Sequence, residues 1–327
     1  MTTINFGVQW HITDICNLRC KHCYREEQQK DLSLAENIKI FENFSRLPKK
    51  LGKKIDISLT GGEALLYPYI KELAEYLRSN EVVDELHLMT NGTIYSPEIV
   101  AFLHKYNIPA IQISIDGNQE SHDFIRGKGN FAKSIENIKR FIENGITIQV
   151  HLVLNKNNIK DVFSLIKLLD SIGVSTFLAT HLVPIGEGAN ISNILISKDE
   201  WKCFQTGVFA YEKESKPKIK ILKGRATWNN FGEAYGSSCP VGINSLNILS
   251  NGDVVLCRRL PIVIGNLLND SIFSIWYDND VLWKMRDRDN LSGKCASCED
   301  KLKCGGCRAL AYAFGNGIMG EDPYCWR

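Results

Sequence analysis

The chain has 327 residues, of which 44% are hydrophobic and 23% charged, and its formal net charge is +2. This composition indicates a globular protein with a substantial core, arranged as one large domain or two of ordinary size. The nearly neutral charge and the lack of a basic stripe with interleaved aromatic residues argue against nucleic acid or an anionic membrane as a partner. We find no signal peptide and no apolar run of membrane-spanning length, and we therefore expect a cytoplasmic protein.

Short apolar runs alternate with amphipathic segments over roughly the first half of the chain. The apolar runs predict strands at residues 4–12, 54–60, 85–91, 110–116, 146–154 and 175–183. The amphipathic segments predict helices at residues 33–44, 69–79, 96–106, 131–145 and 158–173. Ser33 and Glu36 form a capping-box pattern, and Pro97 suits a first helical turn. Gly145 and Gly173 follow helices, where a left-handed cap is needed.

Six strand–helix units predict an α/β protein with a parallel sheet and right-handed crossovers. Their number fits a partial (β/α)6 TIM-like barrel over residues 1–185 better than a two-layer sandwich. Periodicity alone leaves an open doubly wound sheet as an alternative. In a barrel, chemistry takes place at the C-terminal ends of the strands, and a cysteine cluster directly follows the first strand.

The strand–helix pattern ends after about residue 185. Residues 186–234 are interpreted as a connecting segment with a short helix near residues 197–212. Residues 235–327 are rich in cysteine and loop-like. They suggest a small second domain that is held together by metal rather than by apolar burial.

Eleven cysteines in a reducing compartment indicate metal ligands or redox groups rather than structural disulfides. Ten of them fall in two clusters near the ends of the chain. Cys203 stands alone in EWKCFQ, and we interpret it as a small buried hydrophobic residue.

The first cluster comprises Cys16, Cys20 and Cys23 in the stretch ITDICNLRCKHCYR. This C-x3-C-x2-C spacing lets three thiolates converge on one centre from a single loop, but three thiols are one ligand short of a closed tetrahedral site. Three interpretations follow. The site is a zinc site completed by His11 or His22, a [4Fe–4S] cluster that only transfers electrons, or a [4Fe–4S] cluster with one iron free to bind a small molecule.

Further motifs follow the next strands. LTGGEALLYP comes after the second strand, LMTNG ends the third, and ISIDGNQESHDFIRGKGNF begins on the fourth. With these segments in register, the chain resembles the radical S-adenosylmethionine (radical SAM) superfamily. The resemblance implies that the missing fourth ligand is S-adenosylmethionine, whose amino nitrogen and carboxylate oxygen would chelate the open iron.

The same resemblance implies which residues bind this cofactor. The glycine pair permits close backbone approach, and the Glu63 carboxylate suits the methionyl ammonium group. The segment LVPIGEG at residues 182–188 would pass near the adenine, and Ser114 and Asp116 would lie near the ribose and carboxylate. The implied set is Gly61, Gly62, Glu63, Asn91, Ser114, Asp116 and, as a carboxylate partner, Arg126.

The second cluster has seven cysteines between residue 239 and the C-terminus. Taken alone, its C-x2-C pairs leave a zinc-ribbon-like cap open. The pattern resembles the SPASM domain, which carries auxiliary [4Fe–4S] clusters in radical SAM enzymes that mature peptides, proteins or tetrapyrroles. By position, one cluster would be held by Cys295, Cys298, Cys304 and Cys325, and the other by Cys239, Cys257 and Cys307.

Two departures from the SPASM pattern affect this division. Only Gly305 and Gly306 separate Cys304 from Cys307, where the commoner spacing has three residues. No eighth cysteine lies between Cys239 and Cys257, so the inner cluster would have an open iron or a non-cysteine ligand.

The resemblance implies an enzyme that reductively cleaves S-adenosylmethionine to a 5'-deoxyadenosyl radical, which abstracts hydrogen from a substrate. Arg258 follows Cys257 in place of the aspartate of sulfatase-maturating relatives, which disfavours sulfatase maturation. His151 and His181 fall on the fifth and sixth predicted strands. Each could line the cavity or could be a structural residue. The sequence identifies no catalytic acid or base.

Three functions are compatible with these features. The first is modification of a ribosomally made peptide by crosslinking, thioether formation, epimerisation or decarboxylation. Because Cys16 leaves no room for an N-terminal leader-binding module, we expect a separate leader-peptide-binding protein, and a flavodoxin or ferredoxin-type electron donor. The second is tetrapyrrole side-chain chemistry in haem or haem d1 biosynthesis, whose enzymes have a tail similar to CGGCRALAYAFGNGIMGEDPYC. The third is a non-enzymatic iron–sulfur electron carrier.

Overall fold

Ten strands form one continuous sheet in the computed structural model, which describes residues 4–25, 31–223, 227–228, 234–235 and 239–327. The strand order is β12-β11-β10-β1-β2-β3-β4-β5-β6-β7. The first six strands run parallel and lie side by side in chain order. They are β1 (Phe6–Thr13), β2 (Ile55–Gly61), β3 (Val83–Thr90), β4 (Ala110–Ser114), β5 (Thr147–Leu154) and β6 (Thr176–His181).

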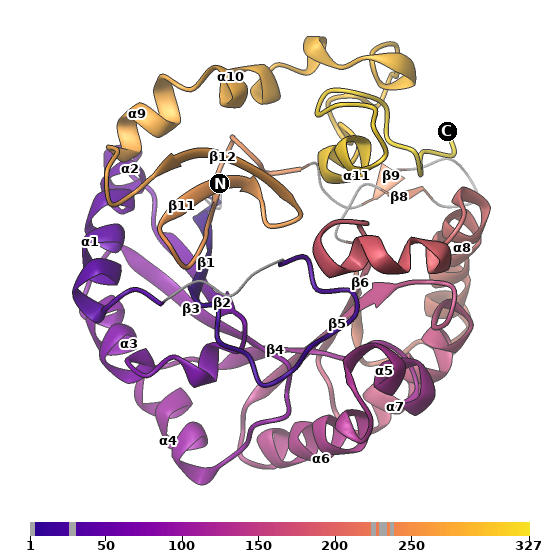
Figure 1. Ribbon diagram of the computed structural model, residues 1–327. Coiled ribbons are helices and arrows are strands. Elements are labelled where there is room, and N and C mark those ends of the chain that lie inside the picture. The colour runs from indigo at the N-terminus through magenta and orange to yellow at the C-terminus, as the bar shows by residue number, and fades with distance from the viewer. Residues whose placement is uncertain (1–3, 26–30, 224–226, 229–233, 236–238) are drawn as a thin grey trace.

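The sequential strand order produces a partial barrel. Every right-handed crossover then turns the same way, which places the connecting helices on one face of the sheet. A doubly wound sheet instead reverses its strand order and carries helices on both faces. Figure 1 shows the helices surrounding the strands on the outside. They are α1 (Leu34–Phe44), α2 (Arg46–Lys50), α3 (Ile70–Arg78), α4 (Pro97–Lys105), α5 (Gln119–Arg126), α6 (Asn130–Glu143) and α7 (Val162–Ser171). The predicted partial (β/α)6 barrel is confirmed.

The predicted helix caps are also confirmed. At the start of α1, the Glu36 amide donates to Ser33 Oγ at 3.3 Å, and the Ser33 amide donates to Glu36 Oε2 at 2.8 Å. Pro97 is the first residue of α4. Gly145 and Gly173 follow helices with φ of +77° and +89°, as a left-handed cap requires.

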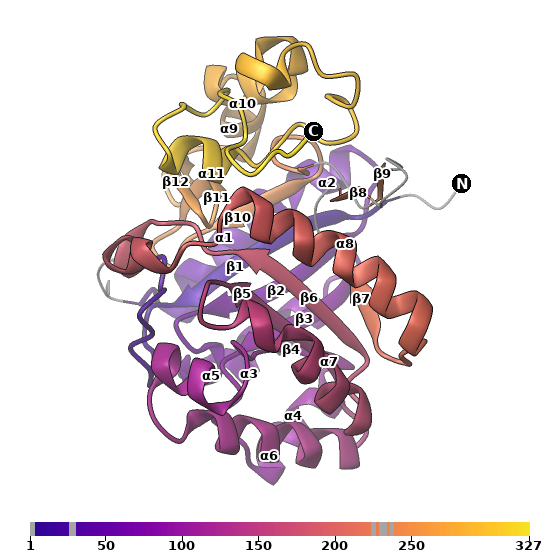
Figure 2. The ribbon, with the colours of Figure 1, turned by 90° about the vertical axis from the view of Figure 1, so that its right-hand side faces the viewer.

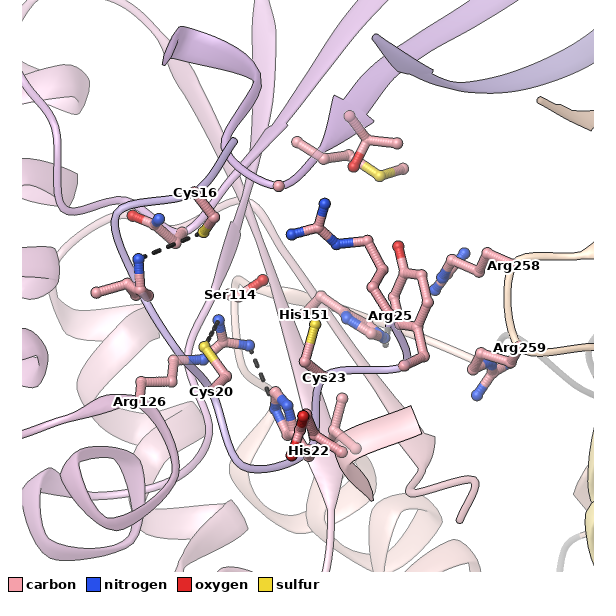
Figure 3. A pocket seen from close by; sticks show the side chains of 18 of the residues that line it. Cys16, Cys20, His22, Cys23, Arg25, Ser114, Arg126, His151, Arg258 and Arg259 are labelled. Carbon is pink, nitrogen blue, oxygen red and sulfur yellow. Dashed lines mark hydrogen bonds between the residues drawn. The ribbon is translucent and has the colours of Figure 1, made fainter. Parts of the chain in front are cut away.

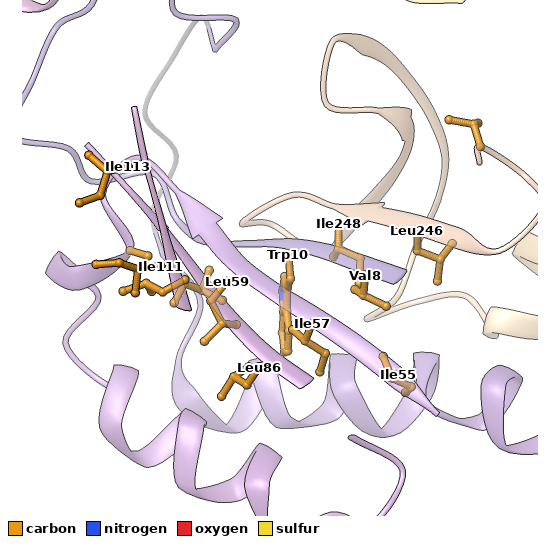
Figure 4. Packing of buried hydrophobic residues seen from close by; sticks show 14 of the residues in the cluster. Val8, Trp10, Ile55, Ile57, Leu59, Leu86, Ile111, Ile113, Leu246 and Ile248 are labelled. Atoms are coloured by element: carbon orange, nitrogen blue, oxygen red, sulfur yellow. The ribbon is translucent and has the colours of Figure 1, made fainter. Parts of the chain in front are cut away.

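The apolar core fills the space between the outer face of the sheet and the helices. Alternate residues of β1 are buried in it, namely Phe6, Val8, Trp10 and Ile12. The Trp10 ring meets Phe44 of α1 edge-on, with 5.5 Å between centroids. Figure 4 shows residues of β2, β3, β4 and β10 joining this packing. The intervening residues of the strands point to the inside of the barrel, where their side chains can line a binding site.

Residues 186–235 contain more structure than the predicted short helix. A 3-10 segment at Gly186–Ile194 leads to α8 (Lys198–Ser215) and then to β7 (Lys220–Leu222), which pairs in parallel with β6. The strands β8 (Thr227–Trp228) and β9 (Ala234–Tyr235) form a separate antiparallel pair. Because β7 has only three residues, no period-two pattern could reveal it.

The C-terminal part continues the barrel sheet, whereas we predicted a loop-like unit held by metal rather than apolar burial. β10 (Ser245–Ile248) pairs in parallel with β1, and β11 (Asp253–Cys257) and β12 (Leu260–Asn266) follow as antiparallel strands. Most of its buried apolar residues belong to the main core cluster, where Trp276 packs against Phe6 with 5.4 Å between ring centroids. Apolar burial therefore stabilises this part of the chain.

Three short α-helices, α9 (Ile272–Tyr277), α10 (Asp280–Arg286) and α11 (Arg308–Ala313), and two 3-10 turns at Arg288–Asn290 and Gly293–Cys295 complete the C-terminal part. Figure 2 places them beyond the β10–β12 strands, at one end of the molecule. Among the described residues, no helix combines the length and apolarity that crossing a lipid bilayer requires.

The interpretation of Cys203 as a buried residue was wrong. Cys203 lies on α8 and is exposed. This helix buries the face formed by Trp201, Phe204, Gln205 and Val208, and position 203 falls outside that face.

Candidate active site

The three N-terminal cysteines lie on the loop that leaves the C-terminal end of β1. Backbone hydrogen bonds tie this loop to β2, from the Gly62 amide to Thr13 O and from the Glu63 amide to Ile15 O, both at 2.8 Å. Gly61 has a φ of +141°, and a β-carbon on either glycine would overlap a carbonyl oxygen of the loop. Glycine at both positions therefore lets the cysteine loop lie against the end of β2.

A cavity of about 460 Å³ opens at this end of the barrel, and Cys16, Cys20 and Cys23 all line it. None of the three thiols forms a disulfide. Figure 3 shows them around the cavity. The strands contribute mostly polar side chains, among them Gln9, Thr60, Thr90, Gln112, Ser114, His151 and Thr180. Because apolar side chains do not fill this end of the barrel, it leaves room for polar ligands.

The cysteine donor set fits an iron–sulfur cluster better than a single ion. In the part of the chain that the structure describes, no three His, Cys, Asp or Glu side chains converge on one ion-sized site. One zinc ion would draw its sulfurs to about 2.3 Å from a common centre, whereas a cubane binds each cysteine at a different iron. Burial raises the pKa of Cys20 to about 11, so iron binding would have to displace its proton.

The two histidines considered as zinc ligands contact other partners. His22 Nε2 lies 2.7 Å from Asp116 Oδ2, and His11 Nε2 lies 3.4 Å from the Tyr24 hydroxyl. His11 does not line the cavity within the described residues. The geometry therefore does not favour a zinc site completed by either imidazole.

Asp116 forms the centre of a buried ion cluster beside the cysteine loop. Its Oδ2 accepts a hydrogen bond from Arg126 Nε at 2.6 Å, and its Oδ1 accepts one from the Val153 amide at 2.9 Å. Burial alone would raise the pKa of Asp116, but Arg126 and His22 outweigh it and hold that pKa well below its usual range. Arg126 Nη1 also reaches Cys20 Sγ at 3.8 Å. The ion pair thus holds a guanidinium against the cysteine loop.

Glu63 is buried among backbone amides. Its Oε2 accepts from the Asn91 amide at 2.8 Å, and its Oε1 accepts from the Leu65 amide at 3.2 Å. The Asn91 side chain donates to Asn17 Oδ1 at 2.8 Å, which ties the end of β3 to the cysteine loop. Five predicted cofactor-binding residues line the cavity, namely Gly61, Gly62, Asn91, Ser114 and Arg126. Glu63 and Asp116 are buried and are not among the described residues that line the cavity. Their contact with the cofactor stays a prediction.

The segment of residues 182–188 packs on the backbone of the cysteine loop. The Gly188 amide donates to Cys23 O at 3.3 Å. Gly186 has a φ of +53°, and a β-carbon there would lie 2.6 Å from the Tyr24 carbonyl carbon. Leu182, Val183 and Glu187 line the cavity. The stretch predicted to pass near the adenine therefore borders the same cavity as the thiols.

Two arginines reach the cavity from the C-terminal part of the chain (Figure 3). Arg258 and Arg259 connect β11 to β12. Arg258 Nη1 donates to Gln9 Oε1 at 2.7 Å, and Arg259 Nη1 donates to His181 O at 3.3 Å. Burial, together with the neighbouring Arg259, lowers the pKa of Arg258. The sequence analysis missed both as site residues because their position depends on the pairing of β10 with β1.

Both histidines considered for the cavity line it. His151 Nε2 lies 3.0 Å from Thr180 Oγ1. Burial first, and then Arg258 and Arg259, lower the pKa of His151 to about 3, so its imidazole is neutral near pH 7. His181 packs its ring against Trp201 and Tyr324, with centroids 3.8 and 4.5 Å away. These ring contacts give His181 a structural role as well.

The C-terminal cysteines fall into two electrostatic neighbourhoods. One contains Cys239, Cys257 and Cys307, and the other contains Cys295, Cys298 and Cys325. Burial raises the pKa of Cys239 to about 11, and the largest further contribution comes from Cys257. Cys304 Sγ accepts a hydrogen bond from the Gly306 amide at 3.3 Å. This grouping agrees with the division that the SPASM resemblance implies for six of the seven cysteines, and the ligand role of Cys304 stays a prediction.

Comparison with known proteins identifies the family. The profile of the Radical SAM superfamily matches residues 10–169, and that of the SPASM iron–sulfur cluster-binding domain matches residues 239–299. An AdoMet-dependent heme synthase of Methanosarcina barkeri is 30% identical, over 99% of this chain and 97% of that protein. The chain belongs to the radical SAM superfamily. This radical SAM enzyme carries a SPASM domain, and its cofactors are [4Fe–4S] clusters and S-adenosylmethionine. The alternative of a non-enzymatic electron carrier was therefore wrong.

Other relatives of this radical SAM enzyme have different named roles. The mycofactocin maturase MftC of Mycolicibacterium smegmatis is 26% identical, over 97% of this chain and 81% of that protein. The crystal structure of Streptococcus suis SuiB bound to S-adenosylmethionine superposes with a TM-score of 0.76 at 18% identity, covering 99% of this chain and 77% of SuiB. The SuiB comparison shows a shared fold.

Proposed function

We propose that this enzyme cleaves S-adenosylmethionine reductively and abstracts a hydrogen atom from a carboxylate-bearing side chain of a tetrapyrrole. A cluster held by Cys16, Cys20 and Cys23 would supply, when reduced, the electron for cleavage of S-adenosylmethionine, and this cofactor would supply the radical that accepts the hydrogen atom. One observation carries the proposal. The thiols of Cys16, Cys20 and Cys23 share a single cavity with side chains from all six barrel strands, so a cofactor bound at the thiols would lie in a cavity that a substrate could also enter.

The chain's own residues would bind and orient the cofactor. Cys16, Cys20 and Cys23 would hold the N-terminal cluster, and the cavity-lining glycines with Ser114 would contact S-adenosylmethionine. Glu63 and Asp116 would act as positioning residues, Glu63 through the Asn91 backbone and Asp116 through Arg126.

The remaining cysteines would hold two auxiliary clusters, divided as the electrostatic neighbourhoods suggest. We assign the core to residues 1–185, the connection to 186–234 and the SPASM domain to 235–327. A flavodoxin or ferredoxin-type protein would deliver electrons. None of the eleven cysteines, all of which the structure describes, forms a disulfide, and we propose a reducing, cytoplasmic location.

Two observations support a tetrapyrrole substrate. AdoMet-dependent heme synthases from three organisms are 28–30% identical over 97–99% of this chain, which is more than the 26% of the maturases. The wall of the cavity is also cationic, with six Lys or Arg side chains and Glu187 as the carboxylate in the described lining. Propionate side chains of a porphyrin carry the complementary charge.

A ribosomal peptide is the second candidate substrate. The mycofactocin maturases support it, because their similarity also extends over 97% of this chain. For such a substrate we propose a separate leader-peptide-binding protein as a partner.

Anaerobic turnover with isotope-labelled substrates tests the proposal. Reconstituted enzyme with dithionite, S-adenosylmethionine and a porphyrin deuterated in its propionate chains should form 5'-deoxyadenosine that contains deuterium. The porphyrin should change in mass in the same reaction. Enzyme that leaves the porphyrin unchanged but alters the mass of a small peptide encoded beside its gene would overturn the tetrapyrrole assignment in favour of the second candidate.

A further inference from the structure

We propose that Arg258 and Arg259 form a carboxylate-binding site for the substrate in the cavity that they share with the N-terminal cysteines. The turn that carries them contacts two distant strands, since Arg258 Nη1 bonds Gln9 of β1 and Arg259 Nη1 bonds the carbonyl of His181 at the end of β6. The proposal rests on the proposed function only for the identity of the molecule that carries the carboxylate.

Six cationic side chains line the cavity, and four of them are either exposed to solvent or paired with a carboxylate. Arg19 and Lys21 are the exposed ones. Arg25 pairs with Asp14 at 2.7 Å, and Arg126 pairs with Asp116 at 2.6 Å. Within the described ranges, neither Arg258 nor Arg259 forms an ion pair with a carboxylate. Both are only partly exposed. A guanidinium that is buried without a counter-ion is unfavourable, and an anionic ligand would relieve the imbalance.

Both guanidinium groups also retain hydrogen-bond donors for a ligand. Each has five N–H donors, and the protein accepts from Arg258 at Gln9 Oε1 and from Arg259 at His181 O. Arg259 Nε is buried without a partner among the described residues. A carboxylate fits such a planar fork with two parallel hydrogen bonds.

Neighbouring polar groups extend the site. His151 and Thr180, which bond to each other at 3.0 Å, line the same cavity. Glu187, the carboxylate in the described lining, lies within hydrogen-bond distance of Asn190 at 3.2 Å rather than of either arginine. Two adjacent guanidiniums suit a substrate with one carboxylate shared by both or with two carboxylates on neighbouring side chains, as in a propionate-bearing porphyrin.

The test removes the negative charge of the ligand and the positive charge of the site separately and measures how each change affects binding. Binding of a propionate porphyrin and of its uncharged methyl ester is measured by anaerobic titration of the iron-loaded enzyme. The variants are Arg258→Gln, Arg259→Gln, the double variant and Arg258→Lys. Arg140→Gln is the matched control, because Arg140 lies over Tyr95 on the exterior helix α6. Cluster spectra and 5'-deoxyadenosine formation without substrate are recorded for each protein.

We expect wild type and Arg140→Gln to bind the acid more tightly than the ester. Each Arg→Gln change should weaken binding of the acid about 10- to 100-fold. The double variant should lose the preference for the acid, while Arg258→Lys keeps part of it. Basal cleavage should fall far less than binding of the acid does, and the cluster spectra should keep their shape.

Two results would overturn the site: an acid-to-ester preference that survives in the double variant, or basal cleavage that falls in parallel with binding. The latter would place the arginines with the cofactor. Porphyrin turnover with unchanged affinity in the double variant rejects the arginine site and leaves the proposed function standing. Arginine-dependent binding without porphyrin turnover rejects the proposed function and leaves the site standing.

Discussion

Replacing Gly62 with alanine should detach the cysteine loop from β2. A β-carbon there would lie 2.6 Å from the Ile15 carbonyl carbon and 2.8 Å from Asp14 O. These are backbone atoms, so no flexible side chain can move aside. Overpacking costs about 1–3 kcal/mol, and the two hydrogen bonds that hold the loop contribute about 0.5–1.5 kcal/mol each. Gly62→Ala should therefore destabilise the wild-type loop position by about 2–6 kcal/mol.

Gly7→Ala is the matched control for this change. Gly7 lies on β1, the strand that leads into the cysteine loop, but a β-carbon there would find its nearest neighbours at 3.9 Å, an ordinary contact. Anaerobic reconstitution followed by iron analysis and thermal unfolding is the assay. Gly62→Ala should bind about four fewer iron atoms per chain, because the N-terminal cluster is lost. Gly7→Ala should retain all its iron. Full iron content and unchanged 5'-deoxyadenosine formation in Gly62→Ala would refute the reasoning.

Three further predictions concern buried charge and the cluster ligands. Asp116→Asn leaves Arg126 buried without its counter-ion and should lower the free energy of unfolding by about 3–5 kcal/mol. The same change at exposed Asp289 should have little effect, and equal losses at the two sites would contradict the buried-pair explanation. The pKa of His151 is lowered to about 3 from an ordinary 6.5, so the unfolded chain binds the additional proton and stability falls as pH drops from about 6.5 toward 3. His151→Gln should flatten this dependence in urea unfolding at pH 7 and pH 5, and an unchanged slope would contradict the depressed pKa. Cys239→Ser and Cys298→Ser should each perturb a different auxiliary signal in electron paramagnetic resonance spectra, whereas identical spectral losses would reject the proposed division.

The barrel could be predicted from the sequence because the patterns that indicate its strands, helices and caps each lie within a short stretch of the chain. Each predicted strand alternates with an amphipathic helix, and caps such as Ser33 with Glu36 lie within four residues of each other. The positions of the cysteine loop and the glycine pair followed from strand order alone, since parallel strands end at the same edge of the sheet.

The C-terminal contribution to the site could not be predicted in this way. β10 pairs with β1 across more than two hundred residues, and that pairing carries Arg258 to Gln9. Neither the short strand nor the pair of arginines has a local pattern that indicates this contact. The exposure of Cys203 was predictable in principle, because residues 201, 204, 205 and 208 already define the buried face of its helix.

The most direct test of the account is the fate of S-adenosylmethionine on the iron-loaded enzyme. Anaerobically reconstituted protein reduced with dithionite should convert S-adenosylmethionine to methionine and 5'-deoxyadenosine. A variant with Cys16, Cys20 and Cys23 all replaced by alanine should not, although its auxiliary clusters remain. Fully iron-loaded wild-type enzyme that leaves S-adenosylmethionine intact, or a triple variant that cleaves it at the wild-type rate, would contradict the assignment of this site.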